Sequence, residues 1–347
     1  MNTPTTPPVA ALPTARPPIA TLPVAARALA VVGWTAESAD AVEAFRAAGT
    51  FLPVGIADAS GTALVRARQD TGLTCHQQVR QFLATAEYDA VLLGVPSSDL
   101  VSLIAGRGAD LLVLAGAADA DTLEAAAEAA RTHGVRLAVV RPEAHDAGIG
   151  DLVRLVESED DWRPRYLEVT VEGPAEVERL AGAAISHALR LVPAAHGLVR
   201  ASAWTGDTST FLRSVRASLD ADDVQLHLSA RHAPRSFVRI VGDADAGAFE
   251  LQISDADATI SYTSRSGERI QYPPEWRDHW TVEAHRVAFV DDSARAREEA
   301  ALLSAIARSA TSGEPQDTNC CARPQLRLIE GRGESRPSRG NLRLVVS

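Results

Sequence analysis

A strand–turn–helix segment near the N-terminus carries the first residues whose types and spacing could do chemistry. One short apolar run, 29–32, ends at Gly33, and a second, 51–57, ends at Asp58. In a dinucleotide-binding unit the first turn holds the pyrophosphate, and an acid about 20–25 residues later binds the ribose. Gly33 and Asp58 are therefore the candidate cofactor-binding residues, although Asp58 could equally be a turn or helix-capping acid.

The turn that follows Gly33 departs from this pattern. It reads Gly-Trp-Thr-Ala-Glu-Ser, where Gly-x-Gly-x-x-Gly is expected. Thr35 places a branched side chain where the pyrophosphate would approach the backbone. Glu37 places a negative charge at the helix N-terminus, where a phosphate would lie. The turn thus disfavours the usual binding of NAD or NADP. Trp34 either fills the cleft that a cofactor would occupy or packs on the core.

A helix expected over 175–192 carries a second pair of candidates. His187 shares a helix face with apolar residues, which favours a core position with a hydrogen bond to the backbone. A role in proton transfer or substrate binding stays open, and it would need a partner that sets the pKa of the imidazole. Arg190, almost one turn further on, could bind an anionic ligand. His187 is the candidate catalytic residue, and Arg190 is the candidate substrate-binding residue.

The composition removes several other kinds of chemistry. All 34 basic residues are arginine, so Schiff-base formation and a lysine general acid are excluded. The three cysteines cannot form a disulfide framework, which favours a reducing, cytoplasmic setting. Cys75-His76 and Cys320-Cys321 are adjacent pairs without the spacing of zinc ligands, so no metal site is predicted.

The length and the net charge limit the classes of protein to which this chain can belong. The 347 residues are enough for two domains of roughly 150 residues each. A net charge of −11 argues against nucleic acid or an anionic membrane surface as a partner. No apolar run approaches the roughly 18 residues that a membrane-spanning helix needs.

The order of expected elements divides the chain into two folded parts and two tails. Strands and helices alternate over 27–145, which predicts a Rossmann-like domain with a parallel sheet. Alternating strands over 146–313 predict an α+β domain with an open antiparallel meander. The leader 1–26 holds seven prolines and the tail 314–347 is rich in arginine, so both are predicted to be disordered.

The individual elements are expected as follows. Helices are predicted near 39–48, 62–71, 77–86, 100–106, 120–133, 149–157, 175–192 and 294–309. Strands are predicted near 29–32, 51–57, 88–96, 110–114, 135–140, 164–171, 198–204, 224–230, 236–241, 248–253 and 258–263.

Several local strings occur in an order that resembles a known family. They are Val54–Asp58, Glu87–Val91, Gly134–Leu137, Arg163–Tyr166 and Phe237–Gly242. Over about 28–315 the chain resembles the glucose–fructose oxidoreductase/inositol dehydrogenase (Gfo/Idh/MocA) family. The resemblance implies NAD or NADP as cofactor and a C-terminal sheet that carries the substrate site. It also implies a homo-oligomer formed through that sheet.

The same comparison shows what is missing. The family's Glu-Lys-Pro motif, which carries the catalytic lysine, would fall on 114–116, which read Leu-Ala-Gly. Asp58 matches the ribose-binding acid of the family. His187 resembles the catalytic histidine of a Gly-Ser-His-x-x-Asp segment, but Arg190 stands where the aspartate is expected.

Three hypotheses follow for the function. The first is a divergent family member that is catalytically weak or silent and acts as a binding or partner subunit. The second is an active NAD(P)-dependent oxidoreductase on a sugar or polyol-like substrate, with Asp58 on the ribose and His187 as acid and base. The third is a protein-interaction scaffold. Backbone N–H groups facing an open cleft at Asp58 would favour the enzyme, and Trp34 in that cleft would count against it.

Overall fold

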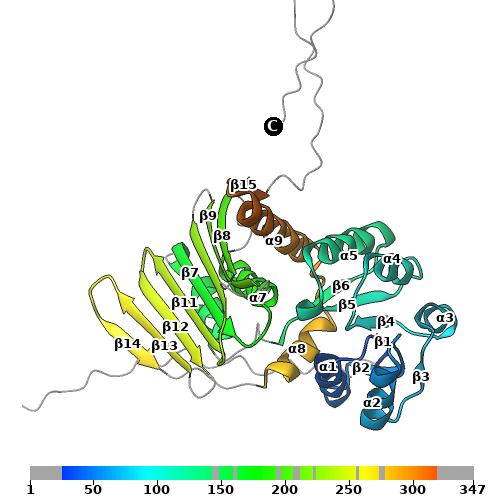
Figure 1. The fold of residues 1–347 in the computed structure, drawn as a ribbon. Coiled ribbons are helices and arrows are strands. Elements are labelled where there is room, and N and C mark those ends of the chain that lie inside the picture. Colours follow the sequence, from blue (N-terminus) through cyan, green and yellow to red (C-terminus); the bar gives the residue numbers. More distant parts are fainter. Residues whose placement is uncertain are drawn as a thin grey trace, which may run out of the picture.

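The computed structural model describes residues 26–142, 148–158, 162–192, 197–205, 212–221, 224–254, 258–272 and 278–318. Within these ranges the chain forms a six-stranded sheet and a nine-stranded sheet, with helices between them (Figure 1). Nearly all of the expected leader and most of the expected tail lie outside the described residues. The expected α/β class, with a Rossmann-like sheet followed by a second, open sheet, is confirmed.

The N-terminal sheet is parallel throughout, in the order β3-β2-β1-β4-β5-β6. The order reverses between β1 and β4, and ligands of such sheets bind at the carboxyl ends of the strands at this point. Its elements are β1 (Arg27–Val32), α1 (Ala36–Ala47), β2 (Phe51–Ala57), α2 (Gly61–Thr71), β3 (Cys75–His76), α3 (Val79–Thr85), β4 (Ala90–Leu93), α4 (Ser98–Ala105), β5 (Asp110–Leu114), the 3₁₀ turn η1 (Ala115–Ala117), α5 (Ala120–His133) and β6 (Leu137–Val140).

Local sequence explains these elements. Strands β4 and β6 are buried along their whole length, as strands covered by helices on both faces must be. Side chains of Thr35, Ser60, Ser97 and Asp119 cap the N-termini of α1, α2, α4 and α5. The sequence pattern located these helices to within about two or three residues because caps and periodicity are local signals.

The C-terminal sheet has the order β14-β13-β12-β11-β7-β10-β9-β8-β15. Its elements are α6 (Ile149–Ser158), β7 (Pro164–Gly173), α7 (Val177–Leu191), β8 (Gly197–Thr205), β9 (Leu212–Ala221), β10 (Gln225–His232), β11 (Phe237–Ala244), β12 (Gly247–Ser254), β13 (Ala258–Ser264), β14 (Arg269–Tyr272), α8 (His279–Val287), α9 (Ser293–Ser312) and β15 (Gln316–Asp317).

The expected antiparallel meander is wrong at the centre of this sheet. Strand β7 lies between β10 and β11, parallel to the first and antiparallel to the second. The sheet is therefore mixed. Strand pairing depends on long-range packing, and an alternating pattern does not specify which neighbour a strand takes. Strands β3, β9, β14 and β15 and helix α8 had no expected counterpart.

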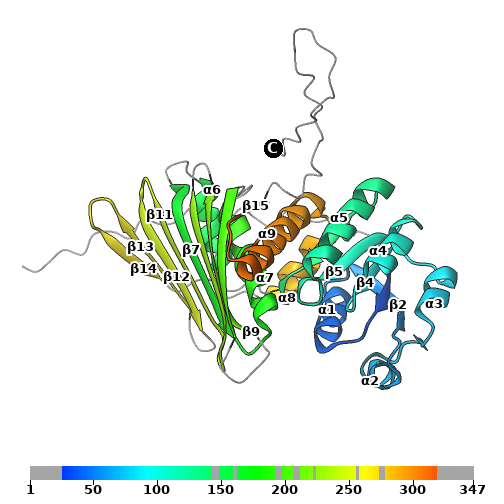
Figure 2. The same ribbon diagram turned by 45° about the horizontal axis from the view of Figure 1, so that its top comes forward.

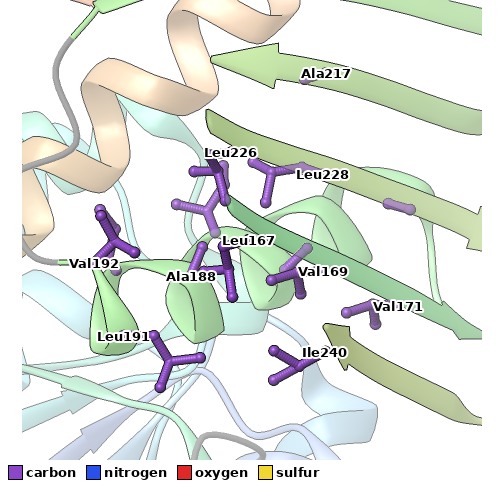
Figure 3. Packing of buried hydrophobic residues seen from close by; sticks show 14 of the residues in the cluster. Leu167, Val169, Val171, Ala188, Leu191, Val192, Ala217, Leu226, Leu228 and Ile240 are labelled. Carbon is purple, nitrogen blue, oxygen red and sulfur yellow. The ribbon is translucent and has the colours of Figure 1, made fainter. Parts of the chain in front are cut away.

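Helix α7 covers the inner face of the second sheet. Leu167 and Val169 of β7 lie beside Ala188 of α7 in the close view of Figure 3, and Val171 and Leu191 belong to the same buried cluster. In Figure 2 the helices α7, α8 and α9 lie between the two sheets. Helix α7 therefore belongs to the layer that joins the two halves of the molecule.

The outer edge of β6 is covered by side chains rather than by another strand. Asp292 accepts a hydrogen bond from the Val139 N–H (2.9 Å), and its own N–H donates to the Leu137 carbonyl (2.6 Å). Arg286 donates to the Val139 carbonyl (2.6 Å) and pairs with Asp292 (2.8 Å). An unpaired edge would leave these backbone groups unsatisfied in a buried position. The segment from α8 to α9 thus completes the first sheet.

The covering extends to the end of β6. Glu283 of α8 accepts from the Arg141 N–H (2.6 Å) and pairs with Arg286 (2.7 Å). The Arg141 guanidinium pairs in turn with Glu299 of α9. All of these acids are at most 5% exposed, so each charge depends on its partner.

Replacing Asp292 by alanine should strongly destabilise the protein. The change leaves the Val139 N–H without its partner and removes one of the two buried acids that pair with Arg286, and breaking a buried pair costs up to about 3–5 kcal/mol. Asp99→Ala is the matched control, because the Arg80–Asp99 pair is exposed and worth about 0–1 kcal/mol. Urea unfolding followed by circular dichroism compares the two variants. Similar small shifts in both would contradict the role assigned to Asp292.

Candidate functional site

The turn between β1 and α1 is tight and satisfies its own donors. Gly33 has φ +83°, and a Cβ there would lie 2.6 Å from the backbone nitrogen of Val95, so only glycine fits. Thr35 accepts from the Ser38 N–H (3.1 Å), and the buried Ser38 hydroxyl donates to the Gly33 carbonyl (2.9 Å). A dinucleotide would need such N–H groups for its pyrophosphate. In this turn the N–H groups of Thr35 and Ser38 already donate to side-chain hydroxyls of the turn itself.

Asp58 lies directly beside this turn. Its carboxylate accepts from the N–H groups of Trp34 and Ser60, both at 2.7 Å. The structure thus brings together Gly33 and Asp58, the two residues expected to bind a cofactor. The carboxylate is nevertheless engaged by backbone donors, for which ribose hydroxyls would have to compete.

Trp34 fills the space next to Asp58. Its side chain is 7% exposed, and its indole N–H donates to Asp70 of α2 (3.2 Å). It packs in the cluster that includes Val42 and Phe45 of α1. The indole therefore lies between the turn and the helix that follows Asp58, where the ribose end of a dinucleotide would lie. Of the two roles left open for Trp34, the structure shows the core position.

Glu37 makes the contact that crosses from this turn to the other domain. Its carboxylate pairs with Arg179 of α7 at 2.7 Å. Burial raises the pKa of Glu37 even though Arg179 acts to lower it. The second oxygen, Oε1, is buried without a hydrogen-bond partner among the described residues. The N-terminus of α1, the usual position of a phosphate, is thus occupied by a half-buried carboxylate.

Arg179 also packs against the turn that follows β5. A Cβ on Gly116 would lie 2.5 Å from the Arg179 guanidinium carbon, so the guanidinium packs directly on the glycine backbone. This is the loop where the resemblance places the missing lysine. Arg179 of α7 thus packs against this loop. The sequence analysis did not single out Arg179. The sequence signals that could have pointed to Arg179 were Gly116, at the position of the family's motif, and Glu37, in the turn after β1.

A cavity of about 830 Å³ opens beside Arg179, between η1, α5, α7 and α9. Alanine, glycine, leucine and isoleucine form most of its wall, and the Arg141–Glu299 pair borders it. Charged side chains of both signs also line it, and its volume is within the range of small-molecule sites.

His187 does not reach this cavity, as far as the described residues define its wall. Its side chain is 1% exposed, and Nδ1 has no hydrogen-bond partner among the described residues. Burial and the charges of Arg190, Arg295 and Arg141 lower the pKa of His187 to about 3. At neutral pH the imidazole is uncharged and enclosed, which is poorly suited to giving a proton to a substrate.

Arg190 belongs to a group of charges rather than to the cavity wall, within the described part of the chain. Burial and the nearby Arg295 and Arg286 lower its pKa to about 10, against the opposing effect of Glu283 and Glu157. The two C-terminal candidates thus lie one turn apart on α7, in a different domain from Gly33 and Asp58. The Glu37–Arg179 ion pair is a contact between α7 and the start of α1.

The described residues contain neither a candidate metal site nor a helix that could span a membrane. Their histidines, cysteines and acids form no group of three or more that could hold a metal ion. None of the helices in the described ranges is long and apolar enough to cross a bilayer.

Comparison with known proteins gives matches in structure but none in sequence. No family model matches the chain, and neither does any curated protein. An oxidoreductase from Agrobacterium radiobacter, solved with NAD+, L-tartaric acid and magnesium, has a TM-score of 0.72 at 13% identity, over 85% of this chain and 99% of its own. Aldose–aldose oxidoreductase from Caulobacter crescentus has a TM-score of 0.69 at 12% identity, over 84% and 99%. Scyllo-inositol dehydrogenase from Lactobacillus casei has 0.68 at 11%, over 84% and 98%.

These neighbours define the class of fold. They are sugar and inositol oxidoreductases of the Gfo/Idh/MocA type, and the chain spans nearly their whole length. The resemblance inferred from the sequence is therefore confirmed for the fold, which is that of NAD(P)-dependent oxidoreductases. An identity of 11–13% is too low to carry over an activity.

The burial of His187 predicts a pH dependence of stability. Its pKa is lower in the folded state than in the unfolded chain, so the unfolded state takes up the proton first as the pH falls. The contribution to stability is complete above about pH 6.5 and is lost progressively below it, with a slope of up to about 1.4 kcal/mol per pH unit. Replacing His187 by leucine should remove this part of the slope between pH 6.5 and 5.

Urea unfolding at several pH values measures the slope. His133→Leu, at the exposed end of α5, is the control and should keep the slope of the original protein. An unchanged slope in His187→Leu would show that His187 takes up a proton equally in both states.

Proposed function

We propose that this chain is a catalytically weak or silent protein with the fold of NAD(P)-dependent oxidoreductases, acting as a binding or partner subunit. The observation that carries the proposal is the Glu37–Arg179 ion pair packed on Gly116. It lies across the cleft in which a bound cofactor would place its phosphates and nicotinamide.

Electrostatics supports this proposal. A pyrophosphate at the N-terminus of α1 would meet the Glu37 carboxylate, and two anions in a partly buried site repel strongly. To admit the phosphate, Glu37 would have to leave Arg179 or take up a proton. Trp34 would have to leave its contact with Asp70 as well. Each change disrupts packing that holds the apo protein together.

The chemistry available at the cleft supports it too. Hydride transfer to or from an alcohol needs a group that moves the hydroxyl proton. The loop after β5 reads Ala-Gly, the chain has no lysine, and His187 is enclosed and uncharged. An arginine guanidinium such as that of Arg179 can bind an anion or a carbonyl oxygen but does not serve as a general acid or base. Binding, rather than turnover, is what this residue set favours.

The main alternative is an active oxidoreductase on a sugar or polyol-like substrate, with Asp58 on the ribose and His187 as acid and base. The structural neighbours favour it, since the Agrobacterium radiobacter enzyme was solved with NAD+. A protein-interaction scaffold is the third candidate, and a homo-oligomer formed through the second sheet is compatible with all three.

Titration calorimetry with NADH and with NADPH tests the proposal. The original protein should show no binding up to millimolar cofactor, because Glu37 and Trp34 occupy the cleft. The double variant Glu37→Ala/Arg179→Ala should gain weak binding, since it removes the carboxylate from the phosphate position. Glu43→Ala/Arg46→Ala, on the exposed side of α1, is the matched control and should behave like the original protein.

Micromolar binding of NADH or NADPH by the original protein would overturn the proposal. A screen of sugars and polyols for reduction of NAD+ or NADP+ would then follow, with His187→Ala as the test of its assigned proton transfer.

A further inference from the structure

Buried polar atoms lie where helices α7 and α9 pack against each other (Figure 2). Ser186 and His187 of α7 are each 1% exposed, and the Ser186 hydroxyl and the His187 Nδ1 have no hydrogen-bond partner among the described residues. The Nε atom of Arg295, in the first turn of α9, is likewise buried without a partner in that part of the chain. Buried polar atoms of native proteins are nearly always hydrogen-bonded, so these three atoms require an explanation.

One hydrogen bond brings the three side chains to the same place. The Nη2 atom of Arg295 donates to the Ser186 carbonyl oxygen at 2.8 Å, so the guanidinium lies against the turn of α7 that carries Ser186 and His187. The charge of Arg295 also reaches the imidazole, because it contributes to the lowered pKa of His187 after burial and Arg190. The three unpartnered atoms therefore belong to one contact between the two helices.

The acids near Arg295 are committed elsewhere or lie further off. Burial lowers the pKa of Arg295, while Asp292, Glu298 and Glu283 act to raise it and Arg286 acts to lower it. Asp292 and Glu283 each pair with Arg286. Within the described part of the chain Arg295 forms an ion pair with none of these acids, and its one hydrogen bond is to a neutral carbonyl. A half-buried guanidinium thus has no direct anionic partner.

Two further arginines surround the same histidine. Arg190 and Arg141 lower the pKa of His187 together with burial and Arg295. Arg141 pairs with Glu299, whereas burial and then Arg295 lower the pKa of Arg190 to about 10. Like charges in a partly buried position repel, and an anion between them reverses the sign of that energy. A water molecule could satisfy the hydrogen bonds of this contact, but it would not offset the charge.

All three unpartnered atoms can donate a hydrogen bond. The Nε atom of an arginine is a donor only, a serine hydroxyl rotates to donate to any acceptor, and a neutral histidine donates from Nδ1 in one of its two tautomers. The partner that suits them is therefore an acceptor with negative charge. Because Ser186 and His187 are almost completely enclosed, that partner must also be small.

We propose that Ser186, His187 and Arg295 form a binding site for a small monovalent anion of the size of chloride. The anion accepts hydrogen bonds from both helices, offsets the charge of Arg295 and thereby holds α9 against α7. None of the three residues belongs to the wall of the Arg179 cavity, as far as the described residues define it. The site does not depend on the function proposed above. The competing occupant is water.

Thermal unfolding in sodium chloride and in sodium gluconate at equal ionic strength tests the proposal. Gluconate is too large for an enclosed site, so chloride alone should raise the melting temperature. The rise should be about 1–2 °C for each tenfold increase in chloride above its Kd. In crystals grown with bromide, an anomalous scattering peak should lie beside Arg295.

Three variants assign the effect to the site. Arg295→Gln removes the charge, so its melting temperature should no longer depend on chloride, and in gluconate it should match that of the original protein. Ser186→Ala removes one donor and should need about tenfold more chloride for the same shift. Arg297→Gln, exposed on the same helix, is the matched control and should respond to chloride like the original protein.

Equal melting temperatures in the two salts would assign the three atoms to water and overturn the proposal. A chloride dependence that persists in Arg295→Gln would place the salt effect elsewhere in the protein. An equal loss of stability in both salts would give Arg295 a purely structural role, and either result overturns the proposal as well. If Arg295→Gln does not fold, Ser186→Ala decides, since an unchanged chloride dependence in that variant excludes the site. The titration with NADH is independent of each of these outcomes.

Discussion

The open edge of β6 is the constraint on which the rest of the structure depends. A parallel sheet that ends on a buried strand leaves a row of N–H and C=O groups without partners. Asp292, Arg286 and Glu283 satisfy that row, and they come from a segment that follows strands β7 to β14 in sequence. The first sheet is therefore completed by the α8–α9 segment. The helices between the two sheets gain a fixed position from the same contacts.

The fixed position of the helices between the sheets determines which side chains contact the turn after β1. Once α9 is anchored on β6, α7 lies between the sheets and carries Arg179 to Gly116 and Glu37. The same placement encloses His187 among arginines. Trp34 thus packs in the core of the first part of the chain, and Arg179 of α7 pairs with Glu37 at the N-terminus of α1. The fold is that of NAD(P)-dependent oxidoreductases.

The two faces of the second sheet carry different side chains. Its inner face is apolar and packs on α7, which ties the sheet to the joining layer (Figure 3). Its outer face carries arginine, glutamate and hydroxyl side chains. Because strand residues alternate between faces, an apolar face and a polar face can be encoded in the same strands.

The sequence by itself determined the elements and the class of fold. Apolar runs, caps and the order of strands and helices are local signals, and they predicted the Rossmann-like sheet, the second sheet and the proximity of Gly33 and Asp58. Only the tertiary structure decided that β7 pairs with β10, that Arg179 of α7 pairs with Glu37 and that side chains cover β6. These features join residues that are 59 to 158 positions apart. A periodic pattern records which face of an element is buried, but it does not record which distant element covers that face.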